Sequence, residues 1–303
     1  MDYQLILDKI YEDVQACYGI GKVASYIPAL ENVNPRKFGM SVKLITGEEY
    51  SVGDYNEAFS IQSISKLISL ALYIKKCGIE LGSRVGIEPS GSAFNSLVQL
   101  EYEQGIPRNP FINAGALVIV DGLLSLYPDV KKEILDFARQ NAQNNAINFD
   151  LEVAESEAQT GFRNAALVNF MKSYGNINNA VDEVLDTYFH QCSISMSCID
   201  LARCFFFLAN KGVNINTRQV LNLREVKRIN SIMLTCGTYD AVGEFAFHVG
   251  IPSKSGVGGG IVSVIPGLMS LAVWSPELCK SGNSVLGMKA LELFTTYTEI
   301  SIF

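Results

Sequence analysis

The residues best suited to chemistry lie in Ser63-Ile64-Ser65-Lys66, the one S-x-x-K stretch of the chain. It follows an extended-looking segment, residues 57–62, and opens an apolar run with helical spacing. At i and i+3 the Ser63 hydroxyl and the Lys66 amine share one helix face, and a helix start favours alkoxide character at Ser63. A poorly solvated lysine has a lowered pKa and can act as a general base. The pair indicates a serine nucleophile; a capping serine beside a surface lysine is the alternative.

A second motif, Lys254-Ser255-Gly256, lies on a predicted strand near the end of the chain. It resembles the K-[ST]-G element of serine β-lactamases and penicillin-binding proteins, in which that strand faces an S-x-x-K helix start. The glycines at 256, 258, 259 and 260 would let a substrate approach the strand backbone, or else form a flexible turn.

The third element of that superfamily, S-x-N or Y-x-N, has one match on paper, Tyr174-Gly175-Asn176. This match falls at the end of a predicted helix, where Gly and Asn are ordinary C-cap residues. We therefore favour a helix cap over a third catalytic element.

The chain is poor in metal-ligand patterns. It has two histidines, His190 and His248, which are not at a helical ligand spacing, and seven cysteines without a C-x-x-C pair. His248 lies in the strand-like stretch 245–249, which favours a structural histidine. We expect no metal, no cofactor and reduced thiols. A G-x-S-x-G elbow, the mark of an α/β-hydrolase, is also absent.

The elements that must position these motifs form a simple pattern. Alternating residues around turn signals predict a hairpin at 38–45 and 49–52 and another at 261–265 and 268–274, with a further strand at 248–254. Helical spacing covers 3–18, 64–75, 114–126, 130–141, 165–174, 178–189, 199–209 and 288–298. This indicates an α+β fold, with an antiparallel sheet completed by both termini. We divide it into a sheet lobe (1–62 and 225–303) and a helical lobe (63–224), with the site between them.

Composition excludes several functions. The net charge of −7 argues against nucleic acid, whose binding needs a basic surface. The longest uncharged apolar stretch, 257–274, is broken by glycines and a proline, so we expect no membrane span. The first residues carry no basic segment leading into an apolar one, so we expect a cytoplasmic protein.

With these motifs in place, the chain from about residue 21 to 303 resembles the serine-dependent glutaminase family. The segments that carry the resemblance are Ser25-Tyr26-Ile27-Pro28, residues 59–66, Glu88-Pro89-Ser90-Gly91 with Phe94-Asn95, residues 109–116, Glu155-Ser156-Glu157, Gly161-Phe162-Arg163-Asn164, Tyr188-Phe189, residues 236–240, residues 245–250 and residues 254–257. Ser25 is a departure, because relatives often have Asp there; it affects none of the roles below.

The resemblance implies a β-lactamase-like fold and hydrolysis of L-glutamine to L-glutamate and ammonia through an acyl-enzyme. It also implies a homotetramer, most often cytosolic in bacteria. The residues to which it gives roles are Ser63 as nucleophile, Lys66 as its partner, Tyr188 and Tyr239 as proton-transfer or hydrogen-bonding groups, the backbone amides of Ser63 and Val257 as oxyanion hole, and Tyr26, Asn113, Glu157 and Asn164 as the glutamine pocket.

Elementary chemistry agrees with these implied roles. Glutamine is a zwitterion, so its ammonium needs a carboxylate such as Glu157 and its α-carboxylate needs donors such as Asn and Tyr side chains. Asn113 and Asn164 could instead cap helices, and Glu157 could be an exposed helix acid. Two other functions stay open, a β-lactamase or peptidase and a non-catalytic amino-acid-binding protein. The division of labour among Lys66, Tyr188 and Tyr239 is also open.

Overall fold

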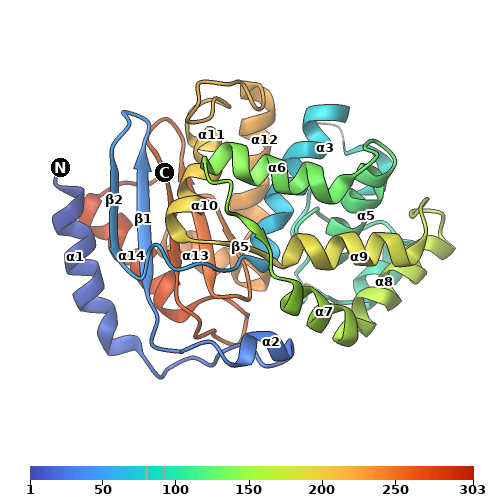
Figure 1. Cartoon of the computed structure of the whole chain (residues 1–303), viewed down its shortest axis with the longest axis horizontal. Helices are drawn as coiled ribbons and strands as arrows, with labels where there is room; N and C mark the ends of the chain where they lie inside the picture. Colours follow the sequence, from blue (N-terminus) through green and yellow to red (C-terminus); the bar gives the residue numbers. More distant parts are fainter. Residues whose placement is uncertain (79–80, 92, 94) are drawn as a thin grey trace.

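A computed structural model of the protein describes residues 1–78, 81–91, 93 and 95–303. Its main sheet has five antiparallel strands in the order β2-β1-β8-β7-β6. Their bounds are β1 (Gly39–Leu44), β2 (Glu49–Gly53), β6 (Ser253–Ser255), β7 (Gly260–Ile265) and β8 (Met269–Trp274). Because β1 pairs with β8, strands from both ends of the chain complete one sheet, as the sequence predicted (Figure 1).

Turn chemistry explains both hairpins. Gly47 and Gly267, each in the turn of its hairpin, adopt φ values of 114° and 78°, where a side chain is strained. A second, three-stranded sheet has the order β3-β5-β4, from β3 (Phe59–Ser60), β5 (Ile194–Met196) and β4 (Asn148–Phe149). It connects the segment before Ser63 to the helical region.

Helices account for most of the rest of the described chain. They are α1 (Tyr3–Asp13), η1 (Val14–Cys17), α2 (Pro28–Glu31), η2 (Gln62–Ser65), α3 (Lys66–Cys77), η3 (Gly82–Arg84), α4 (Val98–Tyr102), α5 (Asn113–Leu124), α6 (Val130–Ala142), α7 (Leu151–Thr160), α8 (Phe162–Ser173), α9 (Val181–Cys192), α10 (Cys198–Cys204), α11 (Phe206–Ala209), α12 (Leu223–Cys236), η4 (Tyr239–Ala241), α13 (Val242–His248) and α14 (Val285–Thr298). Every predicted helix has a counterpart, whereas the α-helices α2, α4, α7, α12 and α13 were not predicted.

The predicted strand at 248–254 is wrong over its first half. Residues 242–248 form α13, and the strand β6 begins only at Ser253. The alternation of apolar residues misled the prediction, because Phe245 is buried while Phe247 is 85% exposed. His248 is also exposed, at the end of that helix, so the strand-like context from which we favoured a structural histidine is wrong.

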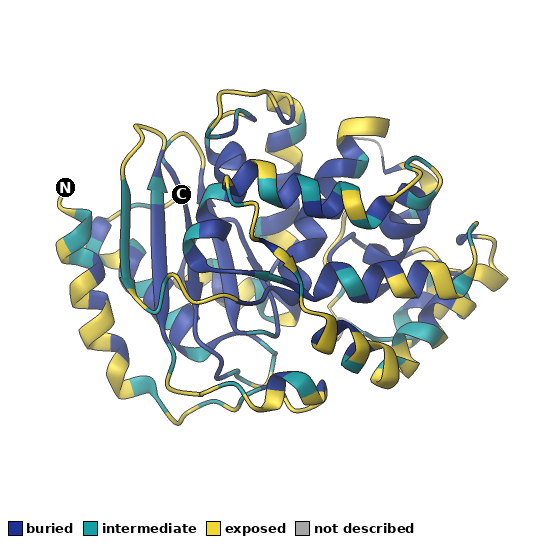
Figure 2. Ribbon diagram, in the orientation of Figure 1, coloured by how far each residue is buried: buried dark blue, intermediate teal, exposed yellow. Residues whose placement is uncertain are grey.

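The two faces of the main sheet pack against different helices. Along β7 and β8, Ile261 and Val273 face a cluster with α1, α13 and α14, while Val262 and Trp274 face the larger cluster of the helical region. This alternation is the two-residue period of a strand buried on both sides. Figure 2 shows the strands buried between helices whose outer surfaces are exposed. We propose the lobes 1–62 with 225–303 and 63–224 as the two sides of this arrangement.

Tyr174-Gly175-Asn176 is a helix cap, as favoured. Tyr174 caps α8, and Gly175 follows with a φ of 74°. The Asn176 amide donates to the backbone oxygens of Arg84 and Gly105, which ties the cap to neighbouring loops. Among the helices of the described residues, none combines the length and apolar character needed to cross a membrane.

Candidate active site

Ser63 lies in the short turn η2, between β3 and α3. Gln62, just before it, has a φ of 49°, a conformation that costs a non-glycine residue on the order of 1 kcal/mol. Such strain at one residue is typical of functional sites. The turn leaves the Ser63 side chain 7% exposed at the wall of a cavity.

The glycine-rich segment after β6 packs directly against this turn. A Cβ on Gly256 would lie 2.4 Å from the Ile61 carbonyl oxygen, and one on Gly258 would lie 2.1 Å from that of Ser60. Both distances are far inside van der Waals contact. These glycines therefore let the chain approach the Ser63 segment closely. We had expected them to make room for a substrate, but it is the neighbouring backbone that requires them.

Val257 lies between those two glycines and lines the same cavity as Ser63, and a Cβ on the neighbouring Gly256 would lie 3.3 Å from the Ser63 backbone nitrogen. Among the hydrogen bonds of the described residues, none uses the backbone N–H of Ser63 or of Val257 as donor. Two free amides near a serine hydroxyl match the requirement of an oxyanion hole.

Lys66 begins α3 and is 1% exposed. Its Nζ donates to the Phe111 carbonyl (3.1 Å) and to Asn113 Oδ1 (2.7 Å). Burial lowers the pKa of Lys66 from 10.5 to about 8, although the charge of Glu157 and the Cys192 thiol partly oppose the change. A lysine with this pKa is neutral in a useful fraction near neutral pH and can accept a proton.

A second lysine, Lys254, is fully buried on β6. Its Nζ donates to the carbonyls of Gly237 (3.1 Å) and Ser255 (2.6 Å) and lies 4.8 Å from the centre of the Tyr239 ring. Burial, with the nearby charge of Lys66, holds the pKa of Lys254 well below its usual value. The K-S-G motif thus contacts Tyr239 through Lys254, at the ring, and through the Ser255 carbonyl, at the hydroxyl.

Tyr239 hydrogen-bonds Ser63, whereas Tyr188 lies beside Lys66. Tyr239 has a φ of 59°, and its phenol hydrogen-bonds with Ser63 and with the Ser255 carbonyl (3.3 Å). Tyr188, on α9, has its ring centre 5.9 Å from Lys66 Nζ. Burial raises the pKa of both phenols, so both are protonated donors at neutral pH.

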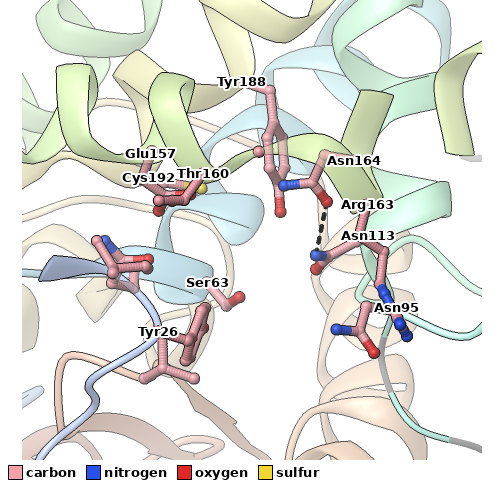
Figure 3. Close-up of a pocket in the computed structure, with 14 residues that line it drawn as sticks. Tyr26, Ser63, Asn95, Asn113, Glu157, Thr160, Arg163, Asn164, Tyr188 and Cys192 are labelled. Carbon is pink, nitrogen blue, oxygen red and sulfur yellow. Dashed lines mark hydrogen bonds between the residues drawn. The ribbon is translucent and has the colours of Figure 1, made fainter. Parts of the chain in front are cut away.

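The cavity has a volume of about 470 Å³, a size ordinary for a small-molecule site (Figure 3). Of the predicted site residues, those that line it are Tyr26, Ser63, Asn113, Glu157, Asn164, Tyr188 and Val257. Lys66 and Tyr239 lie behind this lining, in contact with Asn113 and Ser63 respectively.

Glu157 lies on α7 and is 7% exposed, so it is not the surface helix acid of the alternative interpretation. Burial raises the pKa of Glu157 from 4.5 to about 7, against the opposing effects of a hydrogen bond from Gln62 and the charge of Lys66. Burial disfavours the ionised form of this carboxyl group, and a cationic partner would stabilise that form.

Asn113 and Asn164 hydrogen-bond to each other, with Asn113 Nδ2 donating to Asn164 Oδ1 at 3.0 Å. Neither side chain caps its helix, since the N-caps of α5 and α8 are Ile112 and Gly161. Tyr26 is 55% exposed on the loop before α2, where it closes one side of the cavity. That loop is tied to α7 by the hydrogen bond from the Ala29 amide to Ser156 Oγ.

Some lining residues were not predicted. They are Ile27, Gln62, Asn95, Thr160, Gly161, Arg163 and Cys192. Ile27, Gln62 and Arg163 each adjoin a predicted site residue in the sequence, which was the available signal for those three. Cys192 was detectable only from its place one helical turn after Tyr188. Phe94, part of the family resemblance, lies outside the described residues. The described residues hold no group of three or more His, Cys, Asp or Glu side chains able to bind a metal.

Comparison with known proteins agrees with this geometry. A family model described as glutaminase matches residues 21–303. The glutaminase of Aliarcobacter butzleri (strain RM4018) is 55% identical over 305 aligned residues, covering 100% of both chains. The solved structure of the probable glutaminase ybaS is 34% identical with a TM-score of 0.93, covering 99% of this chain and 97% of that one.

A further solved structure concerns a covalent state. It is the complex of the Bacillus subtilis glutaminase YbgJ with 5-oxo-L-norleucine, formed by reaction with 6-diazo-5-oxo-L-norleucine. It is 29% identical, with a TM-score of 0.85 and complete coverage of both chains. The fold is thus the β-lactamase-like fold of these bacterial enzymes, and the α+β prediction is confirmed. This chain belongs to the glutaminase family.

Proposed function

We propose that this protein hydrolyses the side-chain amide of L-glutamine to L-glutamate and ammonia through an ester on Ser63. The observation that carries the proposal is the meeting, in one cavity, of a serine hydroxyl, two free backbone amides and a buried carboxylate. The choice of glutamine as the substrate rests on the relatives, which are named glutaminase.

In the first half-reaction Ser63 Oγ forms a bond to the amide carbon of glutamine. The Ser63 proton passes to Lys66, directly or through the Tyr239 phenol that hydrogen-bonds Ser63. The amides of Ser63 and Val257 hold the oxyanion, a contribution on the order of 3 kcal/mol per donor. The carbon–nitrogen bond then breaks, and the proton returns to the leaving amine, which departs as ammonia.

In the second half-reaction water attacks the γ-glutamyl ester. The same base takes a proton from the water, and Ser63 leaves as its alkoxide and is reprotonated. Only the neutral amine of Lys66 can accept each proton. The burial of Lys66 supports this role, because it lowers the pKa of Lys66 and so favours the neutral amine. The Glu157 carboxylate holds the α-ammonium of the substrate through both steps.

The test is covalent labelling with 6-diazo-5-oxo-L-norleucine, the glutamine analogue used with the Bacillus subtilis relative. The intact protein should gain one adduct, located by peptide mapping on Ser63, and should release ammonia from glutamine but not from asparagine. Undiminished labelling of Ser63→Ala, or no ammonia from glutamine, would refute the proposal.

We also propose a homotetramer, and we propose that its contact surface includes the exposed apolar side chains of α4 and of the end of α8. Three exposed apolar side chains lie on α4 and at the end of α8: Val98 (66% exposed), Tyr102 (82%) and Tyr174 (49%). The loop after α4 contacts α8 there, because a Cβ on Gly105 would lie 2.7 Å from Tyr174 Cβ. Apolar groups exposed together in this way mark protein contacts.

Light scattering should give a mass near four times 33.2 kDa. Tyr102→Glu should lower that mass, whereas Leu5→Glu, at another exposed apolar position (66%) on α1, should not. A fully active wild-type monomer at micromolar concentration would contradict the proposal. We further propose that the protein is cytoplasmic, which fractionation of the source cells can check.

A further inference from the structure

Two charged side chains line the described part of the active-site cavity, and they have opposite sign. One is the buried acid Glu157 near the end of α7, and the other is Arg163 in the first turn of α8. The helices are separated by the break at Gly161. Figure 3 shows Glu157 and Arg163 on opposite sides of the cavity, with Ser63 between them in this view.

The Arg163 guanidinium is exposed, and it forms no ion pair and no hydrogen bond with the described residues. The deeper cation, Lys66, is already engaged. Its Nζ bonds to the Phe111 carbonyl and to Asn113 Oδ1, and the amide nitrogen of Asn113 in turn bonds to Asn164. Arg163 is therefore the cation that remains available to a ligand in this cavity.

We propose that Arg163 determines specificity by pairing with the α-carboxylate of the substrate. The inference rests on the proposed function and names its substrate class: free glutamine, and not glutamine whose α-carboxyl is blocked in a peptide bond. A zwitterion bound beside Glu157 alone would leave its carboxylate among neutral Asn and Tyr donors. Those groups supply hydrogen bonds, whereas Arg163 supplies the compensating charge.

The exposure of Arg163 sets the size of the effect. A pair open to solvent is screened by salt and is much weaker than a buried pair. It acts mainly on capture of the substrate, since it is made equally in the ground and transition states. We therefore expect loss of Arg163 to raise KM about three- to tenfold with kcat nearly unchanged.

The experiment compares three variants on two substrates. The variants are Arg163→Gln, the charge-keeping Arg163→Lys, and Arg224→Gln, which removes another exposed cation, on α12, that lines a separate cavity. The substrates are L-glutamine and L-glutamine α-amide, whose α-carboxylate is replaced by a neutral carboxamide. Mass spectrometry of the deamidated product separates hydrolysis at the side chain from hydrolysis at the α-amide.

Wild type should prefer glutamine over its α-amide, and Arg163→Gln should lose most of that preference. Arg163→Lys should restore much of it, and Arg224→Gln should behave as wild type. The ratio of wild-type to Arg163→Gln kcat/KM on glutamine should fall toward one as salt rises. Equal losses on both substrates, no loss on glutamine, or the same loss in Arg224→Gln would overturn the inference.

A binding measurement tests the role of Arg163 independently of whether the protein hydrolyses glutamine. Titration calorimetry of Ser63→Ala and of Ser63→Ala with Arg163→Gln should show weaker glutamine binding in the second protein and little difference for the α-amide. Wild type that releases no ammonia from glutamine refutes the proposed function. An active wild type with identical titrations for the two proteins refutes only the role of Arg163.

Discussion

Replacing Glu157 by glutamine should change the pH profile of the enzyme in a way that can be worked out from two buried groups. Burial raises the pKa of Glu157 to about 7 and lowers that of Lys66 to about 8. Catalysis needs Glu157 ionised, to hold the α-ammonium, and Lys66 neutral, to take the serine proton. Both groups must therefore lose a proton before the free enzyme is competent.

In wild type, kcat/KM follows these free-enzyme values. It should rise about a hundredfold per pH unit well below pH 7, about tenfold per unit between the two pKa values, and level off above pH 8. The lower limb of kcat should lie at more acidic pH, because the bound ammonium stabilises the Glu157 carboxylate in the complex.

Glu157→Gln should remove one of the two protons from the profile, leaving a single limb. That limb should lie below pH 8, because the Glu157 charge, which raises the pKa of Lys66, is gone. On the pH plateau, loss of a charge-assisted hydrogen bond of about 1.5–3 kcal/mol corresponds to a ten- to hundredfold lower kcat/KM. When glutamine is replaced by its analogue without the α-amino group, kcat/KM of wild type should fall strongly and that of the variant should fall little.

The assay is ammonia release from pH 5 to 9.5 at constant ionic strength. Glu155→Gln is the matched control, since Glu155 is an exposed acid on the same helix and should leave the profile unchanged. A two-proton limb that survives in Glu157→Gln would refute the pKa reasoning. If the losses from the mutation and from the missing amino group simply add, Glu157 does not contact the ammonium.

Three other outcomes follow from burial and packing. Because the folded-state pKa of Glu157 is raised, the stability present below about pH 4.5 is lost as pH rises through 7. At pH 8 the free energy of unfolding of Glu157→Gln should therefore exceed that of wild type by up to about 3 kcal/mol, seen as a higher Tm, whereas at pH 4 the two should not differ in this way. Gly256→Ala should cost about 2–3 kcal/mol in denaturant unfolding, because its Cβ would lie 2.4 Å from the Ile61 oxygen. Gly243→Ala, in the helix α13 with nothing within 4 Å, should instead be neutral or stabilise by up to about 1 kcal/mol, and equal stability of the two variants would contradict the packing argument. Lys66→Met should lower kcat about 10²- to 10⁴-fold while glutamine still binds, and a variant with near-normal kcat would show that another group is the base.

Much of the framework could be predicted from the sequence, because it depends on neighbours along the chain. Ser63 and Lys66 are three residues apart, so local geometry alone places them together. The hairpins follow from alternation around Gly47 and Gly267, and the helices from apolar periodicity. Where a local pattern was ambiguous the prediction failed: residues 245–248 alternate like a strand, yet they form the helix α13, because only Phe245 meets the core.

The cavity itself was decided by tertiary structure. Val257, Glu157 and Tyr188 come from distant segments, and only the family resemblance, not their spacing, brought them to Ser63. The glycines after β6 looked like a place for substrate, but the close neighbour proved to be the backbone of the Ser63 turn. The one signal for Arg163 was its place beside Asn164 in a segment of the family resemblance; its own position on a helix does not separate it from any exposed helix arginine. The pKa values of Glu157 and Lys66 likewise depend on burial, and burial is a property of all the elements packed around a side chain, which no short stretch of sequence specifies.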